Sequence, residues 1–145
     1  MPDDQFVVNA AVCEKALHEQ DGVVSAIRMA DVFYYTPPPF DIPVEKQAIP
    51  ITLIAKGAAP LDDSTNHTLQ IRLIRPEGDA KLIEVPHEGP FTSKIAGAPG
   101  GFAIATQIPV IPSQMGTHYF AILVDGREMA KVPFTLVRRE VESPQ

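Results

Sequence analysis

Hydrophobic and polar positions alternate most clearly between residues 117 and 137, on either side of an Asp125-Gly126 pair. Asp-Gly between two apolar runs is the strongest short-range signal for a β-hairpin, because both residues tolerate positive φ. The apolar faces of the two arms are Phe120, Ile122 and Val124, and Val132, Phe134 and Leu136. A strict two-residue turn would set Phe120 opposite Lys131 and mismatch these faces. We therefore predict a bulge or a longer loop near Gly126 that sets Phe120 opposite Val132.

The N-terminal part of the chain carries conflicting signals. Residues 6–12 alternate as in a strand, whereas residues 10–20 are rich in helix formers and Gly22 could end a helix. We favour a long hairpin across Asp21-Gly22, with a second strand from Val23 to Tyr35. The residues expected on one side of that strand are Ser25, Ile27, Met29 and Phe33.

Four further strands are predicted over residues 49–55, 68–74, 80–85 and 102–110. The segments between them have loop composition. We interpret residues 36–48, with three successive prolines, as an ordered crossover between sheets, and residues 56–66 as a polar loop. Residues 86–100 are predicted to form a loop with Phe91 and Ile95 turned inward. About eight strands with regular turn signals predict an all-β, immunoglobulin-like two-sheet sandwich.

Composition sets the limits of this prediction. A length of 145 residues suits one domain, with residues 1–4 and 141–145 as frayed tails. The 15 prolines favour a sandwich over a helix bundle, and the single cysteine excludes an internal disulfide. A formal net charge of −6 argues against nucleic-acid binding. We see no signal peptide and no run that would cross a membrane, so we expect a cytoplasmic protein.

Two stretches of the sequence carry a family resemblance. The first is Ala11–Phe33, with Cys13-Glu14, Asp21-Gly22, Ser25 and Asp31. The second is residues 112–134, with Gly116-x-x-Tyr119 followed by Asp125-Gly126, and the segment LQIRLIRPEG lies between them. Together they resemble a family of small bacterial proteins of unknown function. The resemblance implies a β-sandwich and a strand rather than a helix over residues 6–17, and it implies no activity and no catalytic residues.

The residues that could support catalysis or metal binding are not arranged for either. Cys13 would need a nearby base, and a buried position among apolar neighbours is the favoured interpretation. Glu84, His87 and Glu88 are close in sequence, but they lack a recognisable metal-site spacing. Residues 97–101 are glycine-rich without the Lys-Ser/Thr of a phosphate loop. We therefore predict no catalytic residues, no metal and no cofactor.

The most suggestive residues are Asp31, Tyr34, Tyr35 and Phe40, beside the prolines at 37–39. Tyrosine suits interfaces because an apolar ring carries a polar tip, although such residues equally pack cores. An ion pair of Asp31 with Arg28 or Arg72, or a loop-capping hydrogen bond, is the favoured role for that carboxylate. We predict a non-catalytic module that binds another protein or itself through an edge strand or the loop 34–48, with these four residues as the binding site. The alternatives are a carbohydrate- or small-ligand-binding sandwich, which needs a flat tyrosine patch with Asp31 or Asn66, and an enzyme that uses Cys13.

Overall fold

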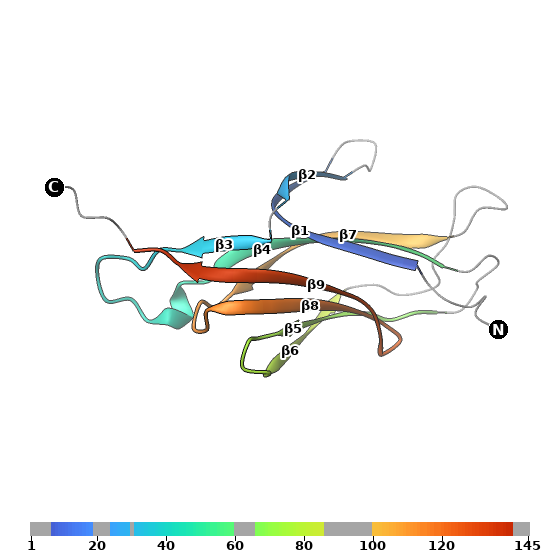
Figure 1. Ribbon diagram of the computed structural model, residues 1–145. Coiled ribbons are helices and arrows are strands. Elements are labelled where there is room, and N and C mark those ends of the chain that lie inside the picture. Colours follow the sequence, from blue (N-terminus) through green and yellow to red (C-terminus); the bar gives the residue numbers. More distant parts are fainter. Residues whose placement is uncertain (1–6, 19–23, 30, 60–65, 86–99, 141–145) are drawn as a thin grey trace.

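The computed structural model describes residues 7–18, 24–29, 31–59, 66–85 and 100–140 (Figure 1). For residues 7, 15–18 and 24–29 it describes the backbone alone. Within these ranges the chain forms nine strands and one short 3-10 helix, η2. Their bounds are β1 Val7–His18, β2 Val24–Met29, β3 Val32–Tyr35, η2 Val44–Lys46, β4 Ile49–Ala58, β5 Leu69–Ile74, β6 Ala80–Val85, β7 Gly101–Val110, β8 Gly116–Val124 and β9 Arg127–Arg138.

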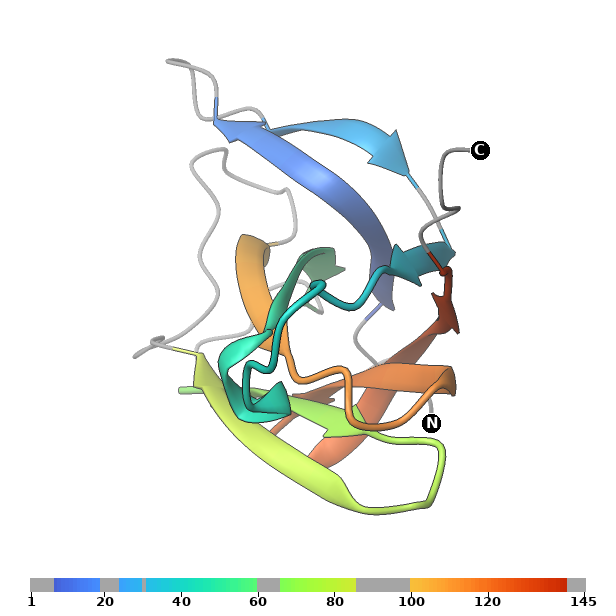
Figure 2. The same ribbon diagram turned by 90° about the vertical axis from the view of Figure 1, so that its left-hand side faces the viewer.

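The strands form two sheets with the core between them, as the view along the strands shows (Figure 2). One sheet has the order β2-β1-β4-β7, and the other has the order β3-β9-β8-β5-β6. Every neighbouring pair is antiparallel except β3 and β9, which run parallel. The predicted all-β two-sheet sandwich is confirmed.

The core consists of the inward-facing residues of the central strands. Alternation places every second side chain of a strand on the same face. On β5 this alternation buries Leu69, Ile71 and Leu73 and leaves the residues between them half-exposed. The largest fully buried apolar side chains are Ile51 and Leu53 on β4, Leu69 and Ile71 on β5, Phe120, Ile122 and Val124 on β8, Phe134 and Leu136 on β9, and Val110 on β7.

The C-terminal hairpin has the predicted register. Phe120 lies opposite Val132, and the turn residues Asp125 and Gly126 have φ of 53° and 80°. The turn has two residues, and the register shifts between Ile122 and Leu123, which pair with Ala130 and Glu128. Met129 is therefore the extra residue of a bulge on β9. This bulge brings the two apolar faces into alignment.

The N-terminal hairpin is confirmed, but the prediction of one strand from Val23 to Tyr35 is wrong. β1 and β2 are strands and pair antiparallel, and the predicted turn at Asp21-Gly22 lies outside the described residues. After β2 the chain crosses to the other sheet, where β3 pairs in parallel with β9. Both segments are extended, so periodicity cannot reveal a change of sheet. The division of this stretch accounts for nine strands instead of about eight.

The predicted polar loop over residues 56–66 begins three residues too early. β4 continues to Ala58, and Lys56, Gly57 and Ala58 pair with β7. A Cβ on Gly57 would lie 2.2 Å from the ring of Phe102, its cross-strand partner. The buried Phe102 ring fills the space that a side chain at position 57 would need. Glycine, which is common in turns, therefore lies within a strand here. Residues 60–65 lie outside the described residues.

The crossover over residues 36–48 is confirmed, because this segment joins β3 of one sheet to β4 of the other. It contains η2, in which Lys46 N donates to Pro43 O and Gln47 N donates to Val44 O. The predicted loop at 86–100, with Phe91 and Ile95, lies outside the description apart from Gly100. Across the described ranges, no helix has the length and apolar character that a bilayer span requires.

Candidate interaction surface

Four residues predicted to form a binding site lie on or beside β3. Asp31 is exposed at the start of β3, Tyr34 is 54% exposed, Tyr35 is half-buried, and Phe40 is 66% exposed in the crossover loop. The loop and the end of β3 occupy the same end of the sandwich (Figure 1). The structure therefore brings the predicted residues to one region, but it does not give them a common orientation.

The exposed apolar surface at this end is formed by two neighbouring strands. The parallel pairing of β3 with β9 sets Tyr34 beside Val137 and Val32 beside Thr135. Val32 and Val137 are each 38% exposed, whereas Phe33 and Leu136 are buried on the inner face. We name Val32, Tyr34, Val137 and Arg139 the β3 corner. Arg139 belongs to it because its guanidinium carbon lies 3.9 Å from the centroid of the Tyr34 ring.

Hydrogen bonds fix the backbone of the β3 corner. Arg139 N donates to Tyr35 O over 2.8 Å, and Thr135 N donates to Asp31 O over 2.7 Å. The cation–π contact of Arg139 orients the Tyr34 ring and covers one of its faces. Tyrosine and arginine held in fixed positions lose little conformational entropy on binding, which is a property of interface anchors.

Tyr35 has a structural role in this region. Its hydroxyl donates to Oε1 of Gln47, and Nε2 of Gln47 donates to Ile42 O. These contacts tie the crossover loop to β3. Because Tyr34 and Tyr35 are adjacent in a strand, their side chains leave β3 on opposite sides. Tyr35 thus positions the loop that exposes Phe40.

The predicted ion pair of Asp31 with Arg72 is wrong. Strands β9 and β8 lie between β3 and β5, which carries Arg72, and three inter-strand spacings amount to about 14 Å. The alternative partner, Arg28, has no described side chain. Asp31 contributes to this region through its backbone carbonyl and as an exposed carboxylate beside the β3 corner.

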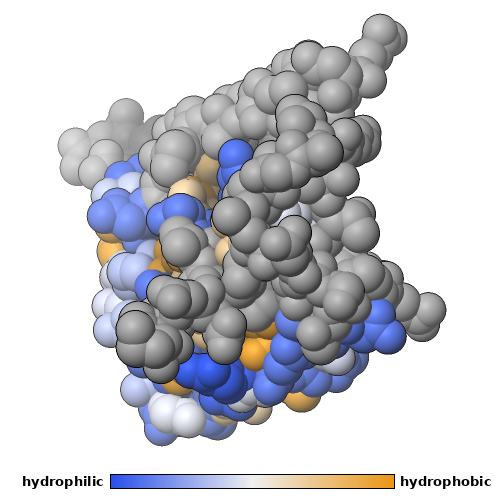
Figure 3. Space-filling view, turned by 90° about the vertical axis from the view of Figure 1, so that its right-hand side faces the viewer, coloured by the Kyte–Doolittle hydropathy of each residue, from blue (hydrophilic) through white to orange (hydrophobic). Residues whose placement is uncertain are grey.

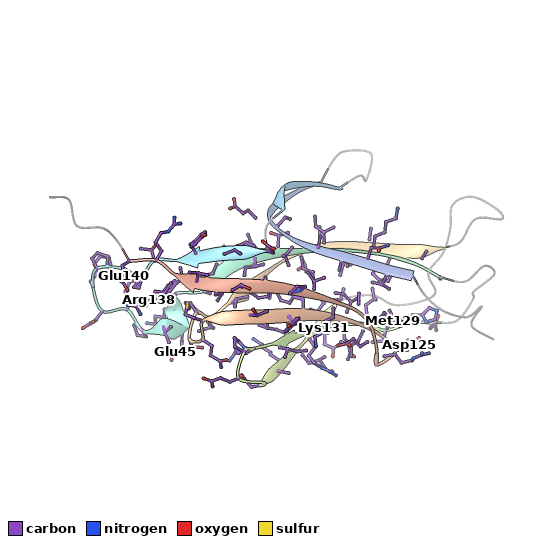
Figure 4. All side chains as sticks on the ribbon, viewed as in Figure 1. Glu45, Asp125, Met129, Lys131, Arg138 and Glu140 are labelled. Atoms are coloured by element: carbon purple, nitrogen blue, oxygen red, sulfur yellow. The ribbon has the colours of Figure 1, made fainter. Side chains whose placement is uncertain are left out.

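Charged residues surround the apolar surface. Arg138 Nε lies 2.6 Å from Glu140 Oε1, and both side chains are more than half exposed. Figure 4 shows this pair at the end of β9, with Glu45 of η2 at the same end of the molecule. The opposite end has a different character, because its described surface in Figure 3 is mostly hydrophilic with small apolar areas. An apolar centre with a charged rim is the usual composition of a protein interface.

Only some of the residues of the β3 corner that were missed have a signal in the sequence. The alternation that placed Leu136 inward also places Val137 outward, so Val137 could have been found by extending the predicted hairpin. Arg139 and Val32 had no such signal, because their importance depends on the parallel pairing of β3 with β9. That pairing joins segments about 100 residues apart and leaves no local pattern.

Asn66 does not complete the predicted carbohydrate site with the tyrosines, whereas Asp31 and Tyr34 are both exposed at β3. Tyr119 lies on β8 opposite Pro133, with Lys131 Nζ 4.5 Å from its ring centroid. Asn66 precedes β5 at the hairpin-turn end, which is the far end of the sheet from Tyr34. The tyrosines and Asn66 therefore do not form one flat patch.

Cys13 is fully buried, as the sequence favoured, so solvent and substrates do not reach its thiol. His87 and Glu88 lie outside the described residues. Among the residues with described positions, no three His, Cys, Asp or Glu side chains are grouped as metal ligands.

Asp125 connects the tip of the C-terminal hairpin to the start of β5. Its carboxylate accepts a hydrogen bond from Thr68 N over 2.9 Å, and its other oxygen lies 2.7 Å from Nδ1 of His67. Asp125 N donates to Thr68 O over 2.9 Å. This pair of a histidine and a carboxylate holds two chain segments together, which accounts for its geometry without a catalytic role.

His118 lies in the core, fully buried on the inner face of β8. Its Nδ1 donates to Gly116 O over 3.0 Å, its ring stacks on Phe134, and Nε2 is buried without a hydrogen-bond partner. Burial lowers the pKa of His118 below the ordinary value of 6.5, and Arg75 lowers it further, whereas the bond to Gly116 and the charge of Asp79 oppose these effects. The ring is therefore neutral near pH 7.

Comparison with known proteins gives a structural match alone. No family model and no curated protein matches the chain. Its fold is similar to part of the Pseudomonas fluorescens alkylpurine DNA glycosylase AlkC, solved bound to DNA containing an abasic site analogue, with a TM-score of 0.57 and 12% identity. The match covers 90% of this chain and 30% of that protein. At this identity, the likeness shows a shared fold and nothing more.

Proposed function

We propose that this chain is a non-catalytic protein-interaction module that binds a protein partner through the β3 corner and the loop 36–48. The observation that carries the proposal is the distribution of exposed apolar side chains. Of the six large hydrophobic residues exposed in the described ranges, four belong to the β3 corner or this loop: Val32, Tyr34, Phe40 and Val137. A shared location favours a binding surface, because isolated exposed apolar residues are common on any protein.

The surface is built to be rigid, which supports the same proposal. Hydrogen bonds from Thr135 and Arg139 hold both ends of β3 against β9. Tyr35 and Gln47 fix the loop that displays Phe40. A partner would therefore bind a preformed surface and would spend little free energy on ordering it.

The first test is the solution mass of the purified protein over a concentration series. If the partner is a second copy, the wild-type chain forms a dimer, and Tyr34→Ser weakens it by at least about tenfold, as for an interface anchor. The control is Arg127→Ser, because Arg127 is exposed at the start of β9, at the far end of this strand from the corner and outside the residues that line the cavities. Equal effects of the two variants would contradict the proposal.

If the purified protein is a monomer, the partner is sought among other proteins. A photo-crosslinking residue at Phe40, with the same residue at Arg127 as control, would be introduced into the chain expressed in its own cells. We expect a discrete crosslinked product at Phe40 that Tyr34→Ser abolishes. If neither position gives a product, or both give the same ones, the corner is not the binding site. Tyr35 is left unchanged, because its substitution would disturb the loop.

DNA is the competing partner, because the similar part of AlkC belongs to a protein solved with DNA. A formal net charge of −6 provides little electrostatic attraction for phosphates. We expect no binding to a labelled duplex with an abasic-site analogue at about 0.15 M salt, a condition under which protein–DNA electrostatics are already weakened. If binding is saturable and is lost in Lys131→Glu or Arg139→Glu, the partner is a nucleic acid and not a protein.

A further inference from the structure

The two sides of the sandwich differ in how they close. On one side, β1 packs against β9. On the other side lie β6 and β7, each the last strand of its sheet. The described residues of β6 and β7 do not pack against each other as those of β1 and β9 do. In Figure 2 both strands lie on the same side of the molecule. The space between them contains two cavities of about 330 Å³ and about 270 Å³.

These cavities form one groove, because both are lined by Ile83 and Thr106. The groove floor is apolar and includes Ile71, Ile104 and Ile108. Ile83 and Ile104 face inward but remain half-exposed, so the described residues leave an edge of the core open along the groove. We name this space the β6–β7 groove.

The walls of the groove select for an extended peptide. β6 pairs with β5 on one edge, and β7 pairs with β4 on one edge. Within the described ranges, the second edge of each strand has no partner strand, so backbone donors and acceptors line both walls. A peptide in strand conformation satisfies such groups while its alternate side chains enter the apolar floor, whereas an acyl chain satisfies none of them.

The length of the groove and the charges at one end of it set further requirements for the peptide. The β7 wall runs from Ala103 to Pro109, a distance of about 20 Å, which suits about six residues of strand. Pro109 has no N–H and ends the ladder. At this end of the groove lie Arg75, which pairs with Asp79 over 3.1 Å, and Lys81, which makes no ion pair among the described residues. An acidic side chain would complement Lys81.

We propose that the β6–β7 groove binds an extended segment of another protein as an added strand on β7. The segment has about six residues, alternating apolar side chains and an acidic residue next to Lys81. The proposal does not depend on the β3 corner, which lies at the opposite edge of the five-stranded sheet.

The test uses the full chain and a fluorescein-labelled synthetic peptide, Thr-Val-Thr-Val-Thr-Val-Asp-Asp, followed by fluorescence anisotropy. We expect saturable binding in the micromolar to sub-millimolar range, below about 1 mM. N-methylation of alternate peptide amides removes strand hydrogen bonds without altering the protein. The odd or the even amides can be methylated, and we expect the peptide whose methyl groups face β7 not to bind. Lys81→Glu should weaken binding by about tenfold, and replacing the two peptide aspartates with lysines should restore it.

Controls separate this proposal from the preceding one. Tyr34→Ser, which tests the β3 corner, should leave the peptide affinity unchanged. Absence of saturation at about 1 mM, or binding indifferent to N-methylation and to Lys81→Glu, overturns the groove as a strand site. Residues 86–99 join β6 to β7 and could be the occupant instead. If the peptide binds only after Phe91→Ser and Ile95→Ser, the groove holds the chain's own segment and the proposal is wrong.

Discussion

The two predicted hairpins share a sequence signal but differ in how the rest of the fold supports them. Both have Asp-Gly between two strand-forming runs. In the C-terminal hairpin, β8 is paired along its length with β9 on one side and along most of it with β5 on the other. In the N-terminal hairpin, β1 pairs with β4 through Cys13 and with β2 from Cys13 onward. The second half of β1 and all of β2 thus form a two-stranded extension of the sheet (Figure 1).

This difference shows that the turn residues and the flanking strands contribute differently to a hairpin. An Asp-Gly pair indicates where a hairpin turns, because it closes the chain with the right twist. It does not specify how many strands flank the hairpin. A two-stranded ribbon alone is marginally stable in water. We therefore expect the C-terminal hairpin to unfold with the whole domain and the N-terminal extension to open locally.

Matched proline substitutions should show the largest difference. Ala121→Pro places a proline in a fully buried position of β8, between β5 and β9, and breaks a ladder on one side. We expect it to lower the free energy of unfolding by about 3 kcal/mol or more. Ala26→Pro, in the edge strand β2, should cost about 1 kcal/mol, at most one ladder bond. Urea unfolding measures both, and equal losses would show that the extension is part of the cooperative core.

Removal of the Asp125 carboxylate should have the next largest effect. Asp125→Ala loses the hydrogen bonds to Thr68 N and His67 and places alanine at a φ of 53°. The expected loss is about 2–4 kcal/mol. Asp125→Asn should cost less, because asparagine tolerates positive φ and its amide oxygen can accept from Thr68 N. Asp21→Ala serves as the counterpart in the other hairpin, and a loss as large as that of Asp125→Ala would remove the distinction between them.

The C-terminal hairpin should also make the protein sensitive to acid through His118. Because its pKa in the folded state is lowered, the unfolded chain binds a proton more readily as the pH falls through 6.5. Stability is therefore greatest above pH 6.5 and decreases toward lower pH, by at most about 1.4 kcal/mol per pH unit for this one group. His118→Phe keeps the ring stacked on Phe134 and should remove this part of the pH dependence. An unchanged slope in urea unfolding between pH 5 and 7 would assign the acid sensitivity to other groups.

The parts of the structure that sequence could predict are those set by neighbouring residues. The register of β8 and β9 followed from two apolar faces and one turn, and the burial of Cys13 followed from its apolar neighbours. The transfer of the chain from β2 to β3 was not predictable, because an extended segment has the same alternation in either sheet. The β3 corner depends on that transfer. The sequence therefore offered Tyr34 and Phe40 as candidates, but it could not predict that Tyr34 lies beside Val137 and Arg139.

The smallest predicted effect concerns the bulge, and it tests whether the register of the C-terminal hairpin depends on the turn or on the apolar faces. Deleting Met129 removes the extra residue but leaves Phe120 opposite Val132 and Ile122 opposite Ala130. The loss should be about 1 kcal/mol, from the partly buried methionine side chain. Deleting Thr135 as a control moves Leu136 to the outer face and offsets β3 from β9, so it should be far more destabilising. If deletion of Met129 were as damaging as deletion of Thr135, the bulge itself would be required. A small loss would show that the apolar faces determine the register and that the bulge only accommodates them to a two-residue turn.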